Sequence, residues 1–398
     1  MRAFPLSVAY VLFPGVMLIG RLLDMPLPRN LVEALWISLA VLALAVILVR
    51  RAISLRSSGP AAAMLIAMAG VITLLFVRLV VPLSMGREVE WIPLAMELKP
   101  VFYLLIAMLW IWAFLPPKPG DFVRAGMALG ALILSEIVIV SIWEGAIVRP
   151  RGSGEINYDA CLLLLSALFA FERASAWRFL GTWVIMLALL ATFSRTAMLA
   201  MVAIFLFGGR GWVLAKIAVV AVAGAFIVGS FLIRELPLDA LNRLDRYWMW
   251  ASAFDLLTTN PWSALLGFPL GASLPVEAPR YLASLWAAQA EGWGVEGVFP
   301  FNYHSFWLRV IIDWGALLAG GALVLLTWLG FSNKRSKLER GVAWLILAEG
   351  ATMGLFFLSN VAIPLVLAMV AIYSPSVRWR NRVAGTFGHA EFEGTQER

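Results

Sequence analysis

Long apolar runs alternate with short polar segments along most of this chain. A helix needs roughly 20 predominantly apolar residues to cross a bilayer, and most of the runs approach that length. They predict an all-α, polytopic integral membrane protein with about twelve transmembrane helices. The expected spans are Ser7–Leu23, Leu31–Val49, Pro60–Val81, Pro100–Leu115, Phe122–Trp143, Ala160–Phe171, Trp177–Phe193, Ala197–Phe207, Trp212–Ile233, Ser305–Phe331, Gly341–Leu358 and Val361–Tyr373.

Basic clusters between the spans orient them. Arg50, Arg51 and Arg56 follow the second span, and the segments NKRSKLER and RWRNR carry the strongest later clusters. Because basic loops stay in the cytoplasm, an even number of spans with both termini cytoplasmic fits every cluster. Residues 1–384 form the predicted membrane domain, and the small, polar residues 385–398 are expected to be a disordered cytoplasmic tail.

One long polar segment interrupts the apolar pattern, and the rest of the chain is organised around it. Residues 234–304 form a predicted periplasmic loop that contains His304, the only histidine before the tail. Within it, Leu238–Leu257 is apolar at helical spacing and is expected to be an amphipathic helix at the outer membrane surface.

Composition excludes a soluble globular domain. Hydrophobic residues make up 62% of the chain and charged residues 14%, and the mean hydropathy is +0.88. The net charge of +7 is carried by short loops, which indicates topology rather than nucleic-acid binding. The single cysteine, Cys161, excludes an intramolecular disulfide, and no nucleotide-binding or metal-binding motif is present, so neither cofactor nor metal is expected.

Two residues are the first candidates for chemistry. His304 is suited to removing a proton from a hydroxyl group near neutral pH, although a histidine at a helix start can also simply hydrogen-bond a carbonyl group. Arg195 lies in the sequence Ser-Arg-Thr, where the chain reverses at the outer end of two spans. Such an arginine either binds an anion or extends to the membrane interface.

Further cations are predicted on the same side. Arg243 and Arg246 share one helical face, unless Asp239 and Asp245 neutralise them. Arg149 and Arg151 lie on the outer side, against the positive-inside rule, and such cations indicate an anionic ligand such as a phosphate or pyrophosphate. Three further charged features fall within spans: Glu136 and Glu349, which are either functional or protonated structural groups, and Arg309 with Asp313, which are expected to pair along one helix.

Four short motifs, in order, carry a resemblance. They are GEINYDACLLLL from Gly154, TFSRTAMLA from Thr192, DRYWMWASAFDLLTTNPWSALLGFPLG from Asp245 and HSFWLRVIIDWG from His304. The chain resembles the superfamily of O-antigen ligases and Wzy-type polysaccharide polymerases over roughly Gly154–Leu325. Asn157, Arg195, Arg246, Trp250 and His304 fall on the family's motif positions, whereas Ser305 stands where the family usually has asparagine.

The resemblance implies a GT-C-like fold and a metal-independent, inverting glycosyltransferase in the bacterial inner membrane. Such enzymes transfer a glycan from an undecaprenyl-pyrophosphate-linked oligosaccharide at the periplasmic face, in the lipid bilayer, and a flippase and a chain-length co-polymerase are the expected protein partners. It implies catalytic roles for Arg195 and Arg246 on the pyrophosphate and for His304 as the base. The expected substrate-binding residues are Asn157 and Trp250, which fall on motif positions, together with the predicted outer cations Arg149, Arg151, Arg243 and Arg280.

Four functions stay open at this point. A polymerase uses a second lipid-linked repeat unit as the acceptor, whereas a ligase uses lipid A core. A lipid-linked glycan transporter would predict inverted repeats and a site near the bilayer midplane, but the sequence has no visible repeat and its polar residues gather in one external loop. A non-catalytic assembly subunit would tolerate the loss of His304. We expect a polymerase.

Overall fold

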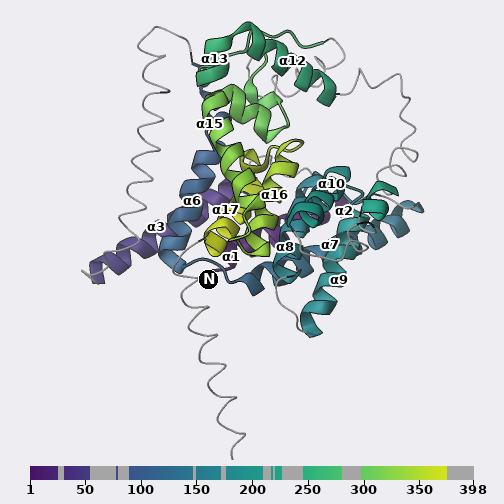
Figure 1. Cartoon of the computed structure of the whole chain (residues 1–398). Coiled ribbons are helices and arrows are strands. Elements are labelled where there is room, and N and C mark those ends of the chain that lie inside the picture. The colour runs from purple at the N-terminus through teal and green to yellow at the C-terminus, as the bar shows by residue number, and fades with distance from the viewer. Residues whose placement is uncertain are drawn as a thin grey trace, which may run out of the picture.

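The computed structural model describes residues 1–25, 31–53, 78, 89–146, 149–171, 176–208, 217, 220–225, 245–279 and 297–373. These residues form helices joined by turns, with one isolated antiparallel β-bridge between Leu274 and Val298, so the predicted all-α class is confirmed for this part of the chain (Figure 1). Most of the predicted spans Pro60–Val81 and Trp212–Ile233, and the tail 385–398, lie outside the described residues.

Four of the described helices are long and apolar enough to cross a bilayer, which indicates a membrane-embedded protein. A fifth span results if α5 (Trp91–Glu97) and α6 (Lys99–Phe114), which meet at a bend of 53°, count as one. The number of about twelve spans stays a prediction. The long spans are Phe4–Leu22, which comprises α1 (Phe4–Ser7), a π-helical turn (Val8–Leu12) and α2 (Phe13–Leu22), Leu31–Val49 within α3 (Leu31–Ile53), α7 (Pro119–Glu144) and α15 (Phe306–Phe331).

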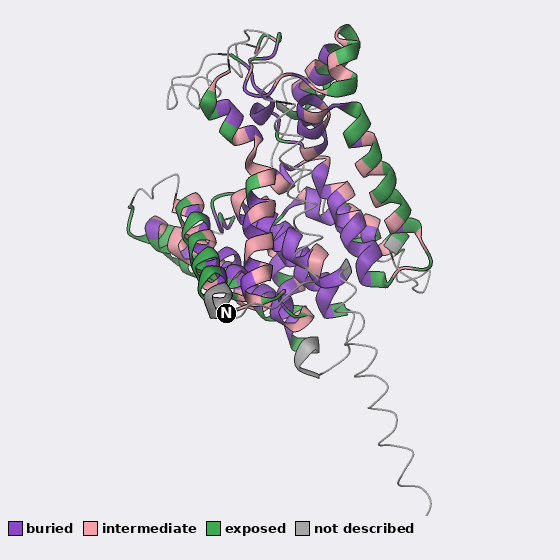
Figure 2. Cartoon of the chain, turned by 90° about the vertical axis from the view of Figure 1, so that its left-hand side faces the viewer, coloured by how far each residue is buried: buried purple, intermediate pink, exposed green. Residues whose placement is uncertain are grey.

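Five shorter helices complete the described bundle, with α8 at its centre. They are α8 (Ile156–Phe171), α9 (Ala176–Ala191), α10 (Arg195–Ala203) with a π-helical turn (Ile204–Gly208), α16 (Lys337–Gly350) and α17 (Ser359–Tyr373). Every residue of α8 from Asp159 to Ala170 is buried, because α7, α9, α16 and α17 pack around it. Figure 2 shows this buried centre surrounded by helices with exposed faces.

Ion pairs between helix ends fix the relative directions of the helices. Arg2 contacts Asp121 at 3.3 Å, and Arg21 contacts Glu136 at 3.1 Å, so the span Phe4–Leu22 runs parallel to α7. Lys99 contacts Glu33 at 2.9 Å, so α3 and α6 also run parallel. Both relations are those that the alternating topology predicts.

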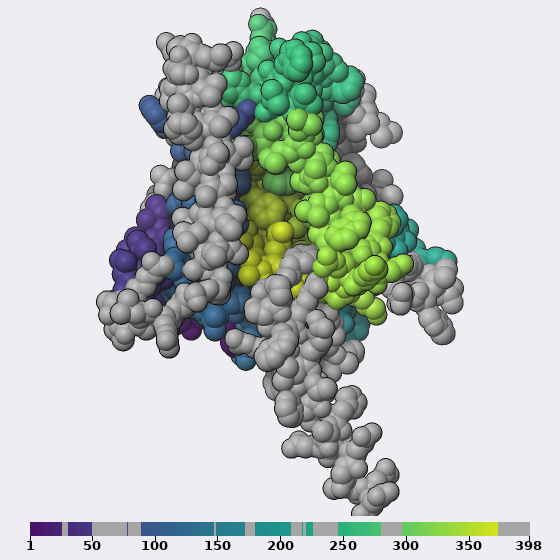
Figure 3. All heavy atoms as spheres, turned by 60° about the vertical axis from the view of Figure 1, so that its left-hand side comes forward, coloured from purple at the N-terminus to yellow at the C-terminus, as the bar shows by residue number. Residues whose placement is uncertain are grey.

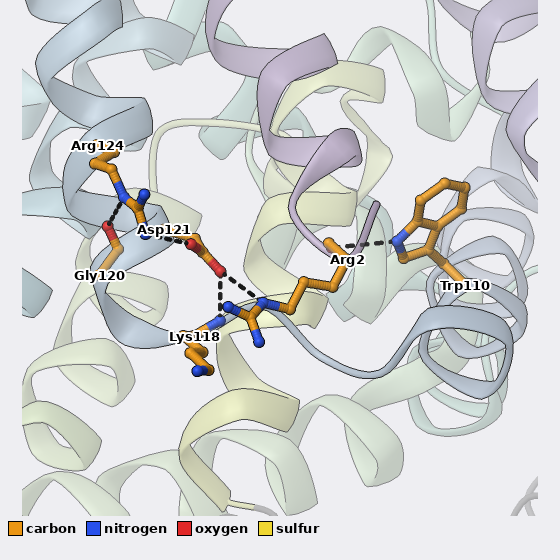
Figure 4. A network of polar contacts seen from close by, with 6 residues as sticks. All are labelled: Arg2, Trp110, Lys118, Gly120, Asp121 and Arg124. Atoms are coloured by element: carbon orange, nitrogen blue, oxygen red, sulfur yellow. Dashed lines mark hydrogen bonds and ion pairs between the residues drawn. The ribbon is translucent and has the colours of Figure 1, made fainter.

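The N-terminal segment is held at the start of α7 (Figure 4). The Asp121 carboxylate accepts a hydrogen bond from the Lys118 backbone N–H at 2.8 Å and contacts Arg2 and Arg124. The Trp110 indole donates to the carbonyl oxygen of Arg2 at 3.2 Å. We call this group of residues, shown in Figure 4, the capped end, since each of its contacts satisfies a helix terminus or a neighbouring charge.

Two helices of the predicted periplasmic loop lie over the start of α15. They are α12 (Asp245–Thr259) and α13 (Pro261–Leu266), at the top of Figures 1 and 3. A helix was expected over Leu238–Leu257, and its described part begins at Asp245. Apolar side chains hold α12 in place: Met249, Ala253 and Leu256 form one buried cluster with Tyr303, Leu308 and Ile312.

The single predicted span Ser305–Phe331 is broken at Gly315, which has φ +83° and ψ 162°. The break leaves helix carbonyl groups without their usual partners, and other segments supply donors. The Phe268 N–H donates to the carbonyl oxygen of Ile312 at 2.7 Å, and the Arg78 guanidinium donates to that of Asp313. Non-helical backbone within an apolar span is tolerated when its polar groups are satisfied within the protein, as they are here.

The predicted span Gly341–Leu358 is wrong. Helix α16 ends at Gly350, and the chain turns through residues 351–354 into a 3₁₀ turn (Leu355–Phe357) before α17 begins. The start of α15 satisfies carbonyl groups at this turn: the Ser305 hydroxyl donates to Gly350, the last residue of α16, at 3.0 Å, and the Phe306 N–H donates to Met353, in the turn that follows, at 2.7 Å. The apolar sequence alone does not reveal these partners.

Candidate active site

His304 lies directly before the N-terminus of α15 and is exposed. Ser305 is the N-cap, whose hydroxyl oxygen accepts a hydrogen bond from the Leu308 N–H at 3.3 Å. The bonds from Ser305 and Phe306 to the end of α16 fix this turn through hydroxyl and backbone groups. The hydrogen bonds that fix this turn come from the two residues after His304, Ser305 and Phe306. The turn therefore places the His304 imidazole at the surface.

Arg309, four residues into α15, also holds the segment that precedes this helix. It is buried, its guanidinium donates to the carbonyl oxygens of Phe301 and Tyr303, and it lies over the Phe357 ring at 4.9 Å. The expected ion pair with Asp313 is absent, because the carbonyl groups of the preceding turn occupy the guanidinium. The Asp313 carboxylate is buried and has no hydrogen-bond partner within the described part of the chain.

Arg195 is the first residue of α10 and is half-buried. The preceding residue, Ser194, is the N-cap, and its hydroxyl oxygen accepts from the Ala197 N–H at 3.4 Å. The same hydroxyl donates to the side-chain oxygen of Asn157 at 2.9 Å and lies 3.1 Å from the Thr196 hydroxyl. The structure thus brings two predicted site residues, Asn157 and Arg195, to adjacent helix starts.

The loop before α8 joins them. The Arg149 guanidinium donates to the carbonyl oxygen of Thr192 at 3.2 Å, so Arg149 reaches the Ser-Arg-Thr turn. The backbone N–H groups of Arg151 and Gly152 donate to Glu136, each at 2.9 Å. With Arg21 as its third partner, Glu136 anchors this loop on α7, which favours the structural interpretation of this carboxylate. The Arg151 side chain is exposed and lines a separate pocket of about 490 Å³ beside Arg21.

Arg246 and Trp250 lie on the exposed face of α12, with 46% of Trp250 accessible. The Ser252 and Tyr303 hydroxyls lie 3.2 Å apart, which ties α12 to the turn before α15. Apolar side chains of α12 also pack against Tyr303, Leu308 and Ile312, so Arg246 lies on a helix that is fixed at the start of α15. Arg243 and Arg280 lie outside the described residues.

These contacts bring distant segments to one end of the bundle. Glu349 lies beside Thr196, and Arg309 interacts electrostatically with Tyr158, the second residue after Ile156 in α8. We call this region the convergent end: α8, α10, α12 and α15 begin there, and α16 ends there. Helix N-termini and arginines favour an anion there, and His304 supplies a group that exchanges protons near neutral pH. No group of three potential metal ligands occurs among the described residues.

The scan against protein-family models and the searches of curated proteins and of solved structures found no significant match. The residues of the convergent end and the four motifs that carry the resemblance are therefore the basis for its function.

The hydrogen bonds of Arg78 and Arg309 to backbone carbonyl groups were not predicted from the sequence. Arg78 donates to the carbonyl oxygens of Leu266 and Phe268 at 2.9 and 2.6 Å, in addition to that of Asp313. Both arginines interrupt apolar runs, which is a signal of a buried, paired cation. Their partners are backbone carbonyl groups, which every residue has, so the sequence contains no sign of where the guanidinium groups bind.

Proposed function

We propose that this protein is a polysaccharide polymerase, a multi-pass glycosyltransferase of the GT-C type with about twelve spans. It transfers a glycan from an undecaprenyl-pyrophosphate-linked donor to a lipid-linked repeat unit at the periplasmic face of the bacterial inner membrane, and both its termini are cytoplasmic. One observation carries the proposal: Asn157, Arg195, Arg246 and His304, which come from four separate motifs, all belong to helix starts at the convergent end.

In the proposed reaction, Arg195 and Arg246 bind the pyrophosphate group of the donor. The acceptor hydroxyl gives its proton to the His304 imidazole as its oxygen bonds to the anomeric carbon. The bond between that carbon and the pyrophosphate oxygen breaks, and undecaprenyl pyrophosphate leaves with the bonding electron pair. Cations already in position stabilise the charge that develops on it. Attack from the face opposite the leaving group inverts the anomeric configuration.

The test is a reconstitution of the purified full-length protein in lipid with an undecaprenyl-pyrophosphate-linked oligosaccharide, with and without a chelator. A ladder of longer glycans from this donor alone is the expected result. Transfer only to added lipid A core would instead make the protein a ligase. A protein that produces neither product, but moves the donor across a vesicle membrane, would be a transporter.

Matched variants assign the residues. Arg195→Ala and His304→Ala are expected to abolish the ladder, because one removes a cation from the pyrophosphate and the other removes the base. Arg124→Ala, a change to an arginine of the capped end whose side chain is 77% exposed, controls for the loss of a cation. His389→Ala, in the tail, controls for the loss of a histidine. Unchanged transfer by His304→Ala would remove the base from the proposal.

A further inference from the structure

The proposed reaction makes no use of a pocket that lies beside the loop joining α7 to α8. Its volume of about 490 Å³ is typical of a small-molecule site. The loop contributes Arg151 to its lining, and the end of α2 contributes Arg21 and Asp24. Met17 and Met25 add apolar surface.

Hydrogen bonds hold the loop side of this pocket in place. Glu136, which also lines the pocket, accepts two backbone N–H groups of the loop, each at 2.9 Å. The Ser153 N–H donates to the Asp159 carboxylate at 2.7 Å, and the Ser153 hydroxyl accepts from the Asn360 amide at 2.8 Å. The wall is therefore formed before a ligand arrives, and binding does not have to order it.

The turn that ends α2 places Asp24 at the pocket. The Met25 N–H donates to the carbonyl oxygen of Gly20 at 2.8 Å, which closes the helix, and Asp24 has a φ of +50° within this turn. Aspartate and asparagine adopt this left-handed conformation more readily than most residues. The aspartate thus suits the turn and supplies a carboxylate to the pocket.

Two charged side chains of the pocket are accessible to a ligand. Arg21 is held by two carboxylates, Glu136 at 3.1 Å and Glu144 at 3.0 Å. Asp24 and Arg151 are exposed, and neither forms an ion pair within the described part of the chain. The pocket therefore offers a carboxylate, which only accepts hydrogen bonds, and a guanidinium, which only donates them.

This combination suits a neutral sugar better than an anion. A hydroxyl group both donates and accepts hydrogen bonds, so sugar hydroxyls can bond to Asp24 and to Arg151. The flexible Met17 and Met25 side chains can adapt to the apolar face of a sugar ring. A phosphate would be repelled by Asp24, and the charge of Arg21 is already balanced by its two carboxylates.

The same loop connects the pocket to the convergent end. Gly154 lines the pocket, and three positions later the Asn157 side chain accepts from the Ser194 hydroxyl at 2.9 Å. Arg149, from the same loop, donates to the carbonyl oxygen of Thr192 at 3.2 Å. Three residues of extended chain span at most about 11 Å, so a few linked sugars can reach from the pocket towards the Ser-Arg-Thr turn.

We propose that this pocket is a glycan-binding subsite, in which Asp24 and Arg151 bind the hydroxyl groups of a neutral sugar of the repeat unit. Its part in the reaction rests on the proposed function. With the pyrophosphate bound by Arg195 and Arg246, the subsite holds sugars away from the bond that reacts. Binding of such remote parts of a substrate orients the reacting groups.

The test measures binding of a glycan that carries no phosphate. The probe is the oligosaccharide released by mild acid from the lipid-linked donor, titrated into the full-length protein in lipid nanodiscs. Arg151→Ala is expected to weaken binding about tenfold, because a hydrogen bond from a charged group is lost. Asp24→Asn is expected to weaken it about threefold, since the amide oxygen still accepts a bond but has no charge.

Both changes leave the pocket wall intact. Arg151 anchors the loop through its backbone N–H, which alanine keeps, and asparagine suits the backbone conformation of Asp24. Arg124→Ala, which removes an exposed guanidinium at the capped end, should bind the oligosaccharide as the wild type does. No binding to the wild type, or wild-type affinity in both pocket variants, would overturn the inference.

Inorganic pyrophosphate distinguishes a sugar site from an anion site. In the proposed arrangement this anion binds at the convergent end, so neither pocket variant should change its affinity. An anion held in the pocket would bind more tightly to Asp24→Asn, which lacks the repelling charge, and more weakly to Arg151→Ala. That result would replace the glycan subsite with a phosphate site.

Transfer assays separate this inference from the proposed function. If the wild type binds the oligosaccharide through Asp24 and Arg151 but makes no ladder, the polymerase proposal fails and the subsite stands. If it makes a ladder and both variants bind the oligosaccharide normally, the subsite alone falls. With the released oligosaccharide as added acceptor, a raised KM for the acceptor in Arg151→Ala assigns the subsite to the acceptor glycan, and a raised KM for the lipid-linked donor assigns it to the donor glycan.

Discussion

The two ends of the bundle use charged residues in opposite ways. At the capped end, Asp121 accepts the Lys118 N–H and contacts Arg2 and Arg124, so the carboxylate has a partner on every side (Figure 4). At the convergent end, the Glu349 carboxylate is buried and has no hydrogen-bond partner of normal geometry among the described residues, and the same holds for Asp313, two turns into α15. The cations there are directed to backbone carbonyl groups, as with Arg309, or exposed, as with Arg246.

The difference separates stabilising charges from functional ones. Ion pairs and helix caps lower the free energy of the folded chain, and the charged residues of the capped end serve mainly this purpose. Unpartnered buried carboxylates raise that free energy, and proteins keep such groups where a reaction or a ligand uses them. Changes at the capped end should therefore alter stability without altering transfer, whereas changes at the convergent end should alter transfer.

Replacing Arg309 should have the largest effect, because this residue both stabilises the fold and shapes the turn that presents His304. In Arg309→Met the buried carbonyl groups of Phe301 and Tyr303 lose their donor, at a cost of roughly 1–3 kcal/mol each. We expect a clear loss of thermal stability together with loss of transfer, since these carbonyl groups belong to the turn that presents His304. Thermal unfolding in detergent and glycan-ladder assays measure the two effects.

Arg335→Met is the matched control for this change. Arg335 also lies over an aromatic ring, that of Trp328 at 5.2 Å, but it forms only a partly exposed ion pair with Glu339. Such pairs contribute about 0–1 kcal/mol. A comparable loss of stability in both variants would show that stacking, and not the carbonyl bonds, makes Arg309 important.

The break in α15 is the next most sensitive point. Gly315 adopts a backbone conformation that is essentially restricted to glycine, and a Cβ atom there would lie 2.3 Å from the carbonyl oxygen of Leu265. Gly315→Ala should destabilise the protein by roughly 2–4 kcal/mol, the sum of strain and overpacking. Gly320→Ala, on the same helix with nothing within 4 Å of its Cβ position, should be nearly neutral in the same unfolding assay. Equal losses of stability in Gly315→Ala and Gly320→Ala would contradict a requirement for glycine at the break.

Much of the fold follows from the apolar runs, and the exceptions have one cause. The predicted start of the span Ser305–Phe331 differs from the observed helix by a single residue, since Ser305 is a recognisable N-cap. The break at Gly315 and the turn after Gly350 were not predicted, because the apolar run continues through both. Their free carbonyl groups are satisfied by Phe268, Arg78, Ser305 and Phe306, and these partners are set by tertiary structure.

The candidate site was predictable to a similar degree. The serine caps next to Arg195 and His304, which are Ser194 and Ser305, are local signals, and the structure joins the first of them to Asn157. Glu349 and Glu136 could not be told apart, since both are carboxylates within apolar runs. Only the donors around them, three for Glu136 and none of normal geometry for Glu349 among the described residues, distinguish an anchor from a candidate for function.

At the capped end, Asp121→Ala should cost about 1–2 kcal/mol, the value of a lost helix cap together with its ion pairs. Transfer per folded molecule should stay at the wild-type rate, because no contact of Asp121 reaches the convergent end. Unfolding and transfer measured on the same preparation test both statements. A fall in the rate per folded molecule would mean that the two ends are coupled, which the separation of stabilising and functional charges does not allow.

The smallest effect is expected for Tyr303→Phe, which removes only the hydroxyl that lies 3.2 Å from Ser252. The loss should be about 0.5–1.5 kcal/mol, the usual contribution of one hydrogen bond.

Burial raises the pKa of Tyr303, so its hydroxyl stays protonated in the folded protein at pH values where the unfolded chain ionises. The unfolded tyrosine releases its proton first, near pH 10, so the stability that the protonated hydroxyl contributes is present below about pH 10 and declines above it. Unfolding of wild type and variant from pH 7 to 11 should therefore show a difference that shrinks at the alkaline end. A constant difference would mean that the pKa of Tyr303 is the same in the folded and unfolded protein, and no difference at any pH would mean that apolar side chains alone hold α12 over α15.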